Sequence, residues 1–247
     1  MTWLEIVVIG AGIGFLGGLF GKGGSAVATP LLFMAGVPAI AAVASPLPAT
    51  IPGTLVAADA YRRAGMIDRR TVALSLAAGL PATILGALAT RWIDGGALVI
   101  VTEIVLVGIG IKLLLPRLTA ETSTGEVETT TSTRLLVVGA LVGLAGGLLA
   151  NSGGFLLAPM YLAVARLRIK PALAASLAVS AVLAVPGTLV HAALGHIDWR
   201  ITMVLALASV PASRFGAQLA IRTGSARLER LYGGGLAVLG VSLLLLR

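Results

Sequence analysis

The sequence contains no cysteine and only two histidines among its 247 residues. The absence of cysteine excludes disulfides, thiolate metal sites and cysteine nucleophiles. Aromatic residues make up 4% of the chain, and neither an aromatic platform nor a basic helix indicates nucleic-acid binding. We find no phosphate-binding loop of the glycine-lysine-Ser/Thr type and no pair of intramembrane aspartates. We therefore expect no enzymatic activity, no metal and no cofactor.

Hydrophobic residues, in contrast, make up 57% of the chain, and its mean hydropathy is +1.02. Apolar runs of about 20 residues, long enough to cross about 30 Å of hydrocarbon as a helix, recur from end to end. They predict an all-α membrane protein with about ten spans. The N-terminal run has neither a preceding basic residue nor a cleavage signal, so it is interpreted as a retained first span. The predicted spans are 2–21, 24–37, 39–60, 71–90, 96–115, 134–150, 153–165, 171–194, 201–221 and 226–246.

The second half of the sequence repeats the first. After a shift of 129 residues, segment 14–30 matches segment 143–159 without a gap. The pairs are Gly14 with Gly143, Gly17 with Gly146, Gly18 with Gly147, Gly24 with Gly153, Pro30 with Pro159 and, further on, Ser45 with Ser176 and Pro81 with Pro211. We predict two five-span repeats, at residues 1–115 and 134–247, joined by a polar linker at 116–133.

The basic residues predict the orientation. With ten crossings, one face of the membrane holds 14 lysines and arginines and the other holds 3, with Arg214 left inside a span. If the two short segments after the glycine motifs turned back instead, the counts would be 9 and 8. Because basic residues favour the cytoplasmic side, the crossing arrangement is preferred. It places both termini outside and the linker in the cytoplasm, and it inverts the second repeat relative to the first.

The glycine motifs indicate an anion site. Segment 24–37 would span only about 21 Å as a helix, which is too short for the membrane. A break at residues 21–24 would let a helix start partway in and expose free N–H groups to the interior. Such a helix end binds anions, and an inverted second break at residues 151–154 would face the first across a central cavity. The alternative role for these glycines is close helix packing, which we expect for Gly14, Gly17 and Gly18.

Several side chains are candidates for binding the anion. They are Lys22, Gly23, Gly24 and Ser25 at the first break, Asn151, Ser152, Gly153 and Gly154 at the second, and Ser45, Ser176, Thr54, Thr188 and Arg214 beyond them. Lys22 and Arg214 have the alternative of extending to the membrane surface, and the Ser and Thr hydroxyls the alternative of bonding their own helix.

The sequence also allows predictions for four acidic or histidine residues and for a group of prolines. Glu103 and His191 are candidates for proton coupling, with an interhelical hydrogen bond or simple packing as the alternatives. Asp68 and Asp198 are predicted to cap helices. Prolines at 46, 48, 52 and 186 predict bending or local unwinding of the two helices that contain them.

These motifs, together with Ala42 to Ser45, Leu173 to Ser176 and the G-x-I-D loops at 65–68 and 195–198, resemble the TauE/SafE family of membrane permeases. The resemblance covers essentially the whole chain, although GKGGS and ANSGG stand where the family has G-x-G-G-G. It implies a secondary transporter that exports sulfite or an organosulfonate across a bacterial inner membrane. The predicted partners are a small anion and the lipid bilayer. Alternatives are transport of another anion or of a cation, although carboxylates are absent from both breaks, or a non-transporting scaffold subunit.

Overall fold

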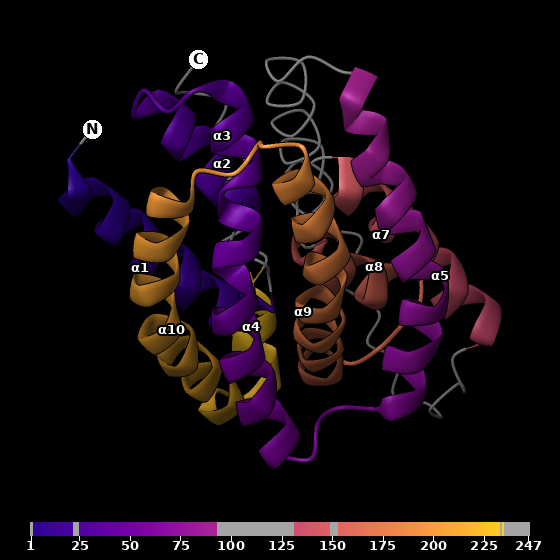
Figure 1. Cartoon of the computed structure of the whole chain (residues 1–247). Helices are drawn as coiled ribbons and strands as arrows, with labels where there is room; N and C mark the ends of the chain where they lie inside the picture. Colours follow the sequence, from indigo (N-terminus) through magenta and orange to yellow (C-terminus); the bar gives the residue numbers. More distant parts are fainter. Residues whose placement is uncertain (1, 22–24, 93–130, 149–152, 233, 235–247) are drawn as a thin grey trace.

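The computed structural model describes residues 2–21, 25–92, 131–148, 153–232 and 234. All regular structure within them is helical (Figure 1), which confirms the all-α prediction. The helices are α1 (Trp3–Phe20), α2 (Ser25–Met34), α3 (Ala39–Ala44), α4 (Pro46–Arg63), α5 (Arg69–Ala89), η1 (Thr90–Trp92), α7 (Ser132–Leu148), α8 (Gly154–Ala163), α9 (Ile169–Ala193) and α10 (Trp199–Arg222).

Among the described residues, five helical stretches are long and apolar enough to cross a membrane. They are Trp3–Phe20, Ala39–Arg63, Arg69–Trp92, Ile169–Ala193 and Trp199–Arg222. Each agrees with a predicted span to within a few residues, and α7 is a shorter apolar helix at the predicted span 134–150. The predicted span 96–115, like most of 226–246, lies outside the described residues. The ten-span arrangement therefore stays a prediction.

Short helices follow both glycine motifs, as the sequence predicts. Helices α2 and α8 have 10 residues each, or about 15 Å of helix, half the thickness of the hydrocarbon. Gly21 ends α1 and Gly153 precedes α8, with φ angles of 65° and 72°. Glycine adopts this left-handed backbone without strain, so the sequence itself sets both breaks.

Proline divides one long helix and leaves its counterpart intact. Ser45 separates α3 from α4, and Pro46 occupies the first turn of α4. Helix α9, in contrast, is continuous through Pro186. Of the two predicted alternatives at Pro186, local unwinding is therefore not seen, and bending stays a prediction.

The two halves pack together with matching contacts. Helix α1 lies along α10, and its sequence counterpart α7 lies along α5. A Cβ atom at Gly14 or Gly18 would clash with the backbone of α10, at Ser209 and Ser213 respectively. In the other pair, Gly143 meets the backbone of Gly79 and Gly147 meets that of Thr83. The packing role predicted for Gly14 and Gly18 is confirmed, and it recurs at the repeat-related positions.

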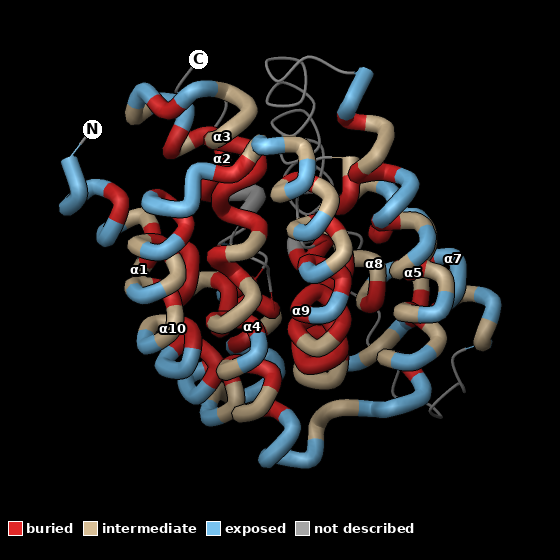
Figure 2. The backbone as a smooth tube through the Cα atoms, in the orientation of Figure 1, coloured by how far each residue is buried: buried red, intermediate tan, exposed pale blue. Residues whose placement is uncertain are grey.

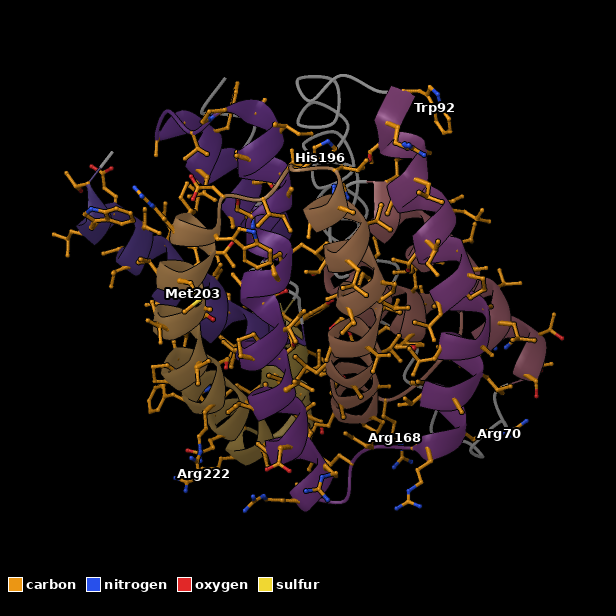
Figure 3. The ribbon with its side chains drawn as sticks, viewed as in Figure 1. Arg70, Trp92, Arg168, His196, Met203 and Arg222 are labelled. Atoms are coloured by element: carbon orange, nitrogen blue, oxygen red, sulfur yellow. The ribbon has the colours of Figure 1, made fainter. Side chains whose placement is uncertain are left out.

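Equivalent helices run in opposite directions. In Figure 3, Arg70, Arg168 and Arg222 lie at one end of the molecule, whereas Trp92 and His196 lie at the other. Helix α5 therefore runs from the arginine end toward Trp92, and α10, its counterpart, runs toward Arg222. Helix α9 likewise runs opposite to α4 (Figure 1).

Burial is greatest on α9 and on the faces of α4 toward it, whereas the outer faces of α5 and α10 are exposed (Figure 2). Large apolar side chains cover those outer faces, including Leu85, Leu207 and Phe215, which are 64%, 70% and 64% exposed. Such a surface suits a hydrocarbon environment, because in water it would form an unusually large apolar patch. The polar groups of interest are therefore those buried around α9.

Candidate functional site

The two glycine breaks meet at one buried side chain. Ser176 on α9 is 0% exposed, and its Oγ atom lies 2.6 Å from the carbonyl oxygen of Gly21 and 3.1 Å from that of Gly154. The single hydroxyl proton of Ser176 is shared between these two carbonyl acceptors. One acceptor is at the end of α1 and the other at the start of α8. The ends of helices from opposite halves thus lie side by side. We call Ser176, Gly21 and Gly154 the junction.

Close packing fixes the geometry of the junction. A Cβ atom on Gly21 would lie 2.8 Å from the Cα of Leu173 on α9, so glycine is required by space as well as by φ. On the other side, the Gly153 carbonyl accepts hydrogen bonds from the amides of Leu156 and Leu157, at 3.0 and 2.9 Å. The amides of residues 154 and 155 precede this turn and are not used inside α8. The first turn of α8 therefore lies at the junction, which it contacts through the Gly154 carbonyl.

A small cavity lies among α1, α4, α9 and α10, and none of the three junction residues lines it. Three of the five glycines of α1 (Gly14, Gly17 and Gly18) line it, together with Thr54 of α4 and Leu177, the neighbour of Ser176. Its volume is about 10 Å³, enough for about one water-sized group. An anion of four heavy atoms, such as sulfite, does not fit in a cavity of this size.

Of two other predicted hydroxyl groups, Ser45 links different elements and Thr54 bonds its own helix. The Oγ of Ser45 accepts a hydrogen bond from the backbone N–H of Asp198 at 2.9 Å, and the Ser45 carbonyl accepts one from the Thr202 hydroxyl at 3.0 Å. Ser45 thus ties α4 to the loop between α9 and α10. The Thr54 hydroxyl lies 2.9 and 3.0 Å from the Thr50 and Ile51 carbonyls of its own helix.

A second buried polar group lies near the end of α9. His191 is 0% exposed, and its Nδ1 atom lies 3.1 Å from Nδ1 of His196. At this distance one Nδ1 donates and the other accepts. The Nε2 atom of His191 and the Oγ1 atom of Thr188, one turn away, are buried without a hydrogen-bond partner among the described residues. The backbone of Gly147, near the second glycine break, is close to the His191 ring.

Sequence reasoning identified His191 but missed His196. The signal was available, because His196 lies in the G-x-I-D loop directly after the helix that carries His191. Partial burial lowers the pKa of His196, since the charged form loses hydration. Partial burial therefore favours the neutral state of His196.

Arg214 lies away from the junction. It is exposed on the outer face of α10, in a groove with Arg63 and Arg222. Its neighbour Ser213 faces inward instead, and donates to the Gly53 carbonyl at 2.9 Å. The inward and outward faces of α10 are thus separate environments.

The remaining candidates lie partly outside the described residues. Ser25 is the first residue of α2. The others are Lys22, Gly23, Gly24, Glu103, Asn151 and Ser152, none of which the structure describes.

Asp68 and Asp198 cap helices, as predicted. Asp68 accepts from the amides of Arg70 and Thr71, at 3.1 and 3.0 Å, and Asp198 accepts from the amides of Arg200 and Ile201, at 2.9 and 3.2 Å. A hydrogen bond from the Thr71 hydroxyl, at 2.6 Å, is the main reason why the pKa of Asp68 is lowered. Helix capping explains the presence of Asp68 and Asp198 without a role in binding or transport.

The fold and the junction together define a multi-pass helical membrane protein. In each half of the chain, a glycine motif interrupts the helices. The chain belongs to the TauE/SafE family, because residues 6–243 match the family described as "Sulfite exporter TauE/SafE". It is 29% identical over 238 residues to a "Probable membrane transporter protein" of Xylella fastidiosa, covering 92% of this chain and 90% of that protein. It is 24% identical to the "Probable membrane transporter protein YunE" of Bacillus subtilis, covering 89% and 87%. No solved structure matches it significantly. The protein is a membrane transporter.

Proposed function

We propose that this protein is a secondary transporter that exports a small sulfur-containing anion, sulfite or an organosulfonate, through the inner membrane of a bacterium. The substrate binds at the junction, near the middle of the bilayer. Ten crossings form two inverted repeats, both termini are outside, and the basic end of the molecule faces the cytoplasm.

One observation supports the site above all others: Ser176 contacts both Gly21 and Gly154. The residues that follow Gly21 lead into α2, and Gly154 begins α8. Helix α8 therefore begins, and α1 ends, beside one buried hydroxyl group, and we infer that α2 begins nearby. Helix N-termini stabilise negative charge through unpaired N–H groups and the helix dipole. In a low-dielectric interior this preference is stronger than in water.

The side chains of the two breaks complete the proposed pocket. Lys22 supplies a positive charge from the first half, and Ser25 a hydroxyl group. Asn151 and Ser152 supply neutral donors from the second half, where no charge is present. This asymmetry suits an anion with one or two negative charges and several oxygen acceptors.

Alternating access requires the junction to open. The small cavity lined by Leu177 holds far less than a sulfonate, and Ser176 joins α9 of one half to the end of α1 of the other. Movement of one half against the other would widen the cavity and exchange these hydrogen bonds for bonds to substrate. His191 and Glu103 are the candidates for a coupled proton.

Flux into proteoliposomes tests the proposal. Purified protein is expected to give saturable movement of ³⁵S-labelled sulfite or taurine that an excess of related sulfonates inhibits and chloride does not. The Lys22→Gln variant, reconstituted at the same level, should lose this flux, because the pocket loses its charge. Retained flux in that variant refutes the role of Lys22. Absence of flux with every sulfur oxyanion and sulfonate refutes the function.

A further inference from the structure

A large groove lies on the outside of the molecule, between α4 and α10. Its volume is about 650 Å³, and three arginines line it: Arg63 on α4, and Arg214 and Arg222 on α10. Gln218 lies between the latter two in sequence, and Asp59 is the one acid in the lining. The three positive charges against one negative charge give the groove a net charge of +2.

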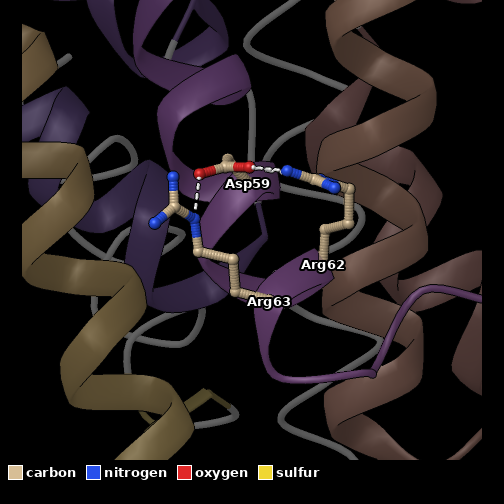
Figure 4. Close-up of polar contacts among 3 residues, drawn as sticks. All are labelled: Asp59, Arg62 and Arg63. Atoms are coloured by element: carbon tan, nitrogen blue, oxygen red, sulfur yellow. Dashed lines mark hydrogen bonds and ion pairs between the residues drawn. The ribbon is translucent and has the colours of Figure 1, made fainter.

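The acid is already neutralised by its neighbours. Asp59 forms ion pairs with Arg62 at 2.6 Å and with Arg63 at 2.7 Å (Figure 4). Arg63 uses its Nε atom in this pair. The pairs orient the end of α4 and leave Arg214 and Arg222 across the groove to attract an anion.

The groove combines charge with an apolar border. Leu55 in its lining is 53% exposed, and Phe215 and Leu219, on either side of Gln218 in α10, are 64% and 41% exposed. Arg214 lies eight residues before Arg222, or about 12 Å deeper along the helix axis. A soluble anion would pair with the arginines but leave these apolar side chains uncovered. An anionic amphiphile would pair with the arginines and also cover the apolar side chains.

The internal duplication provides a comparison within one chain. With the shift of 130 residues that relates Pro81 to Pro211, the positions of Arg214, Gln218 and Arg222 on α10 correspond to Ile84, Leu88 and Trp92 on α5. This face is apolar on α5, the counterpart of α10 in the first half. Trp92, just after α5, and Arg222, at the end of α10, lie at opposite ends of the molecule (Figure 3). Helix packing alone therefore does not require the arginines.

We propose that this groove binds the headgroup of an anionic phospholipid, with the phosphate between Arg214 and Arg222 and the acyl chains along the apolar border. A charged side chain within a span is costly unless it has a partner, and a lipid phosphate at the interface supplies one. Basic grooves between helices at the cytoplasmic surface are suited to such headgroups. The lipid would hold the ends of α4 and α10 together.

Thermal unfolding of the purified full chain in a neutral detergent tests this, with tryptophan fluorescence as the signal. Phosphatidylglycerol is expected to raise the Tm of the wild type, whereas phosphatidylcholine and inorganic phosphate at equal concentration are not. The phosphatidylglycerol concentration that gives half of this shift should rise roughly fivefold in Arg214→Ile and about thirtyfold in Arg214→Ile with Arg222→Gln.

Arg200→Gln is the matched control, because Arg200 is an exposed arginine at the other end of the same helix. It should respond to phosphatidylglycerol as the wild type does. If the double variant does not fold, Arg63→Gln provides an independent loss of one groove charge. An equal response of wild type and groove variants overturns the proposal. A response to inorganic phosphate alone, or equal responses to both lipids, also overturns it, in favour of a soluble-anion site or of nonspecific solvation.

Discussion

Removal of the Ser176 hydroxyl group should loosen the junction. The Ser176→Ala variant leaves the carbonyls of Gly21 and Gly154 without this donor, in a position that is fully buried. A buried acceptor left unsatisfied costs about 1–3 kcal/mol, and interhelical hydrogen bonds in membranes fall toward the lower end of this range. We therefore expect a loss of about 1 kcal/mol in the free energy of unfolding, which for a chain of this size lowers the Tm by roughly 2–4 °C.

Ser180 provides the matched control. It lies one turn further along α9 and is equally buried, but its hydroxyl donates to the Leu177 carbonyl of its own helix at 3.2 Å. Ser180→Ala removes the same atom without separating two halves of the protein, so its Tm should fall by less than about 2 °C. The assay is thermal unfolding in detergent, followed by tryptophan fluorescence. Equal Tm values for the two variants would show that Ser176 does not link the breaks.

Three further predictions concern packing, capping and pH. Gly18→Ala should cost about 1–3 kcal/mol in unfolding free energy, because its Cβ meets the backbone of Ser213, whereas Gly12→Ala, with open space around it, should be neutral or stabilising; similar costs would contradict the packing. Asp68→Ala and Asp198→Ala should each cost about 1 kcal/mol in denaturant titrations, and an unchanged midpoint would argue against the caps. The pKa of His196 is lowered, so its contribution to stability is full above about pH 6.5 and is lost as the pH falls through the folded pKa; His196→Gln should flatten the Tm between pH 5 and 7, and an unaltered pH profile would refute this.

Features set by the local backbone could be predicted from the sequence. Gly21 and Gly153 adopt positive φ at both predicted breaks, and Asp68 and Asp198 cap the predicted helices. These outcomes depend on residue type and on immediate neighbours. Helix bounds followed for the same reason, since apolar length determines where a span begins and ends.

Contacts between distant parts of the chain could not be predicted in this way. Ser176 bonds a residue 155 positions away, and nothing in its local pattern distinguishes it from Ser45, which ties α4 to a loop instead. Arg214 and Ser213 are adjacent in sequence but face opposite environments. Which face of α10 turns inward depends on how α1 and α4 pack around it. Periodicity within one largely apolar helix does not carry that information.

The central claim is that both glycine breaks line one anion pocket, and thiol protection tests it most directly. The chain has no cysteine, so Ser25→Cys and Ser152→Cys each introduce a single thiol, one at each break, and Arg200→Cys gives an exposed control. Methyl methanethiosulfonate labels the thiols while sulfoacetate is titrated, since sulfite would itself attack the reagent. The account predicts that sulfoacetate slows labelling at both breaks with the same half-maximal concentration and leaves the control unaffected. Protection at one break alone, or at clearly different concentrations, would contradict a shared pocket.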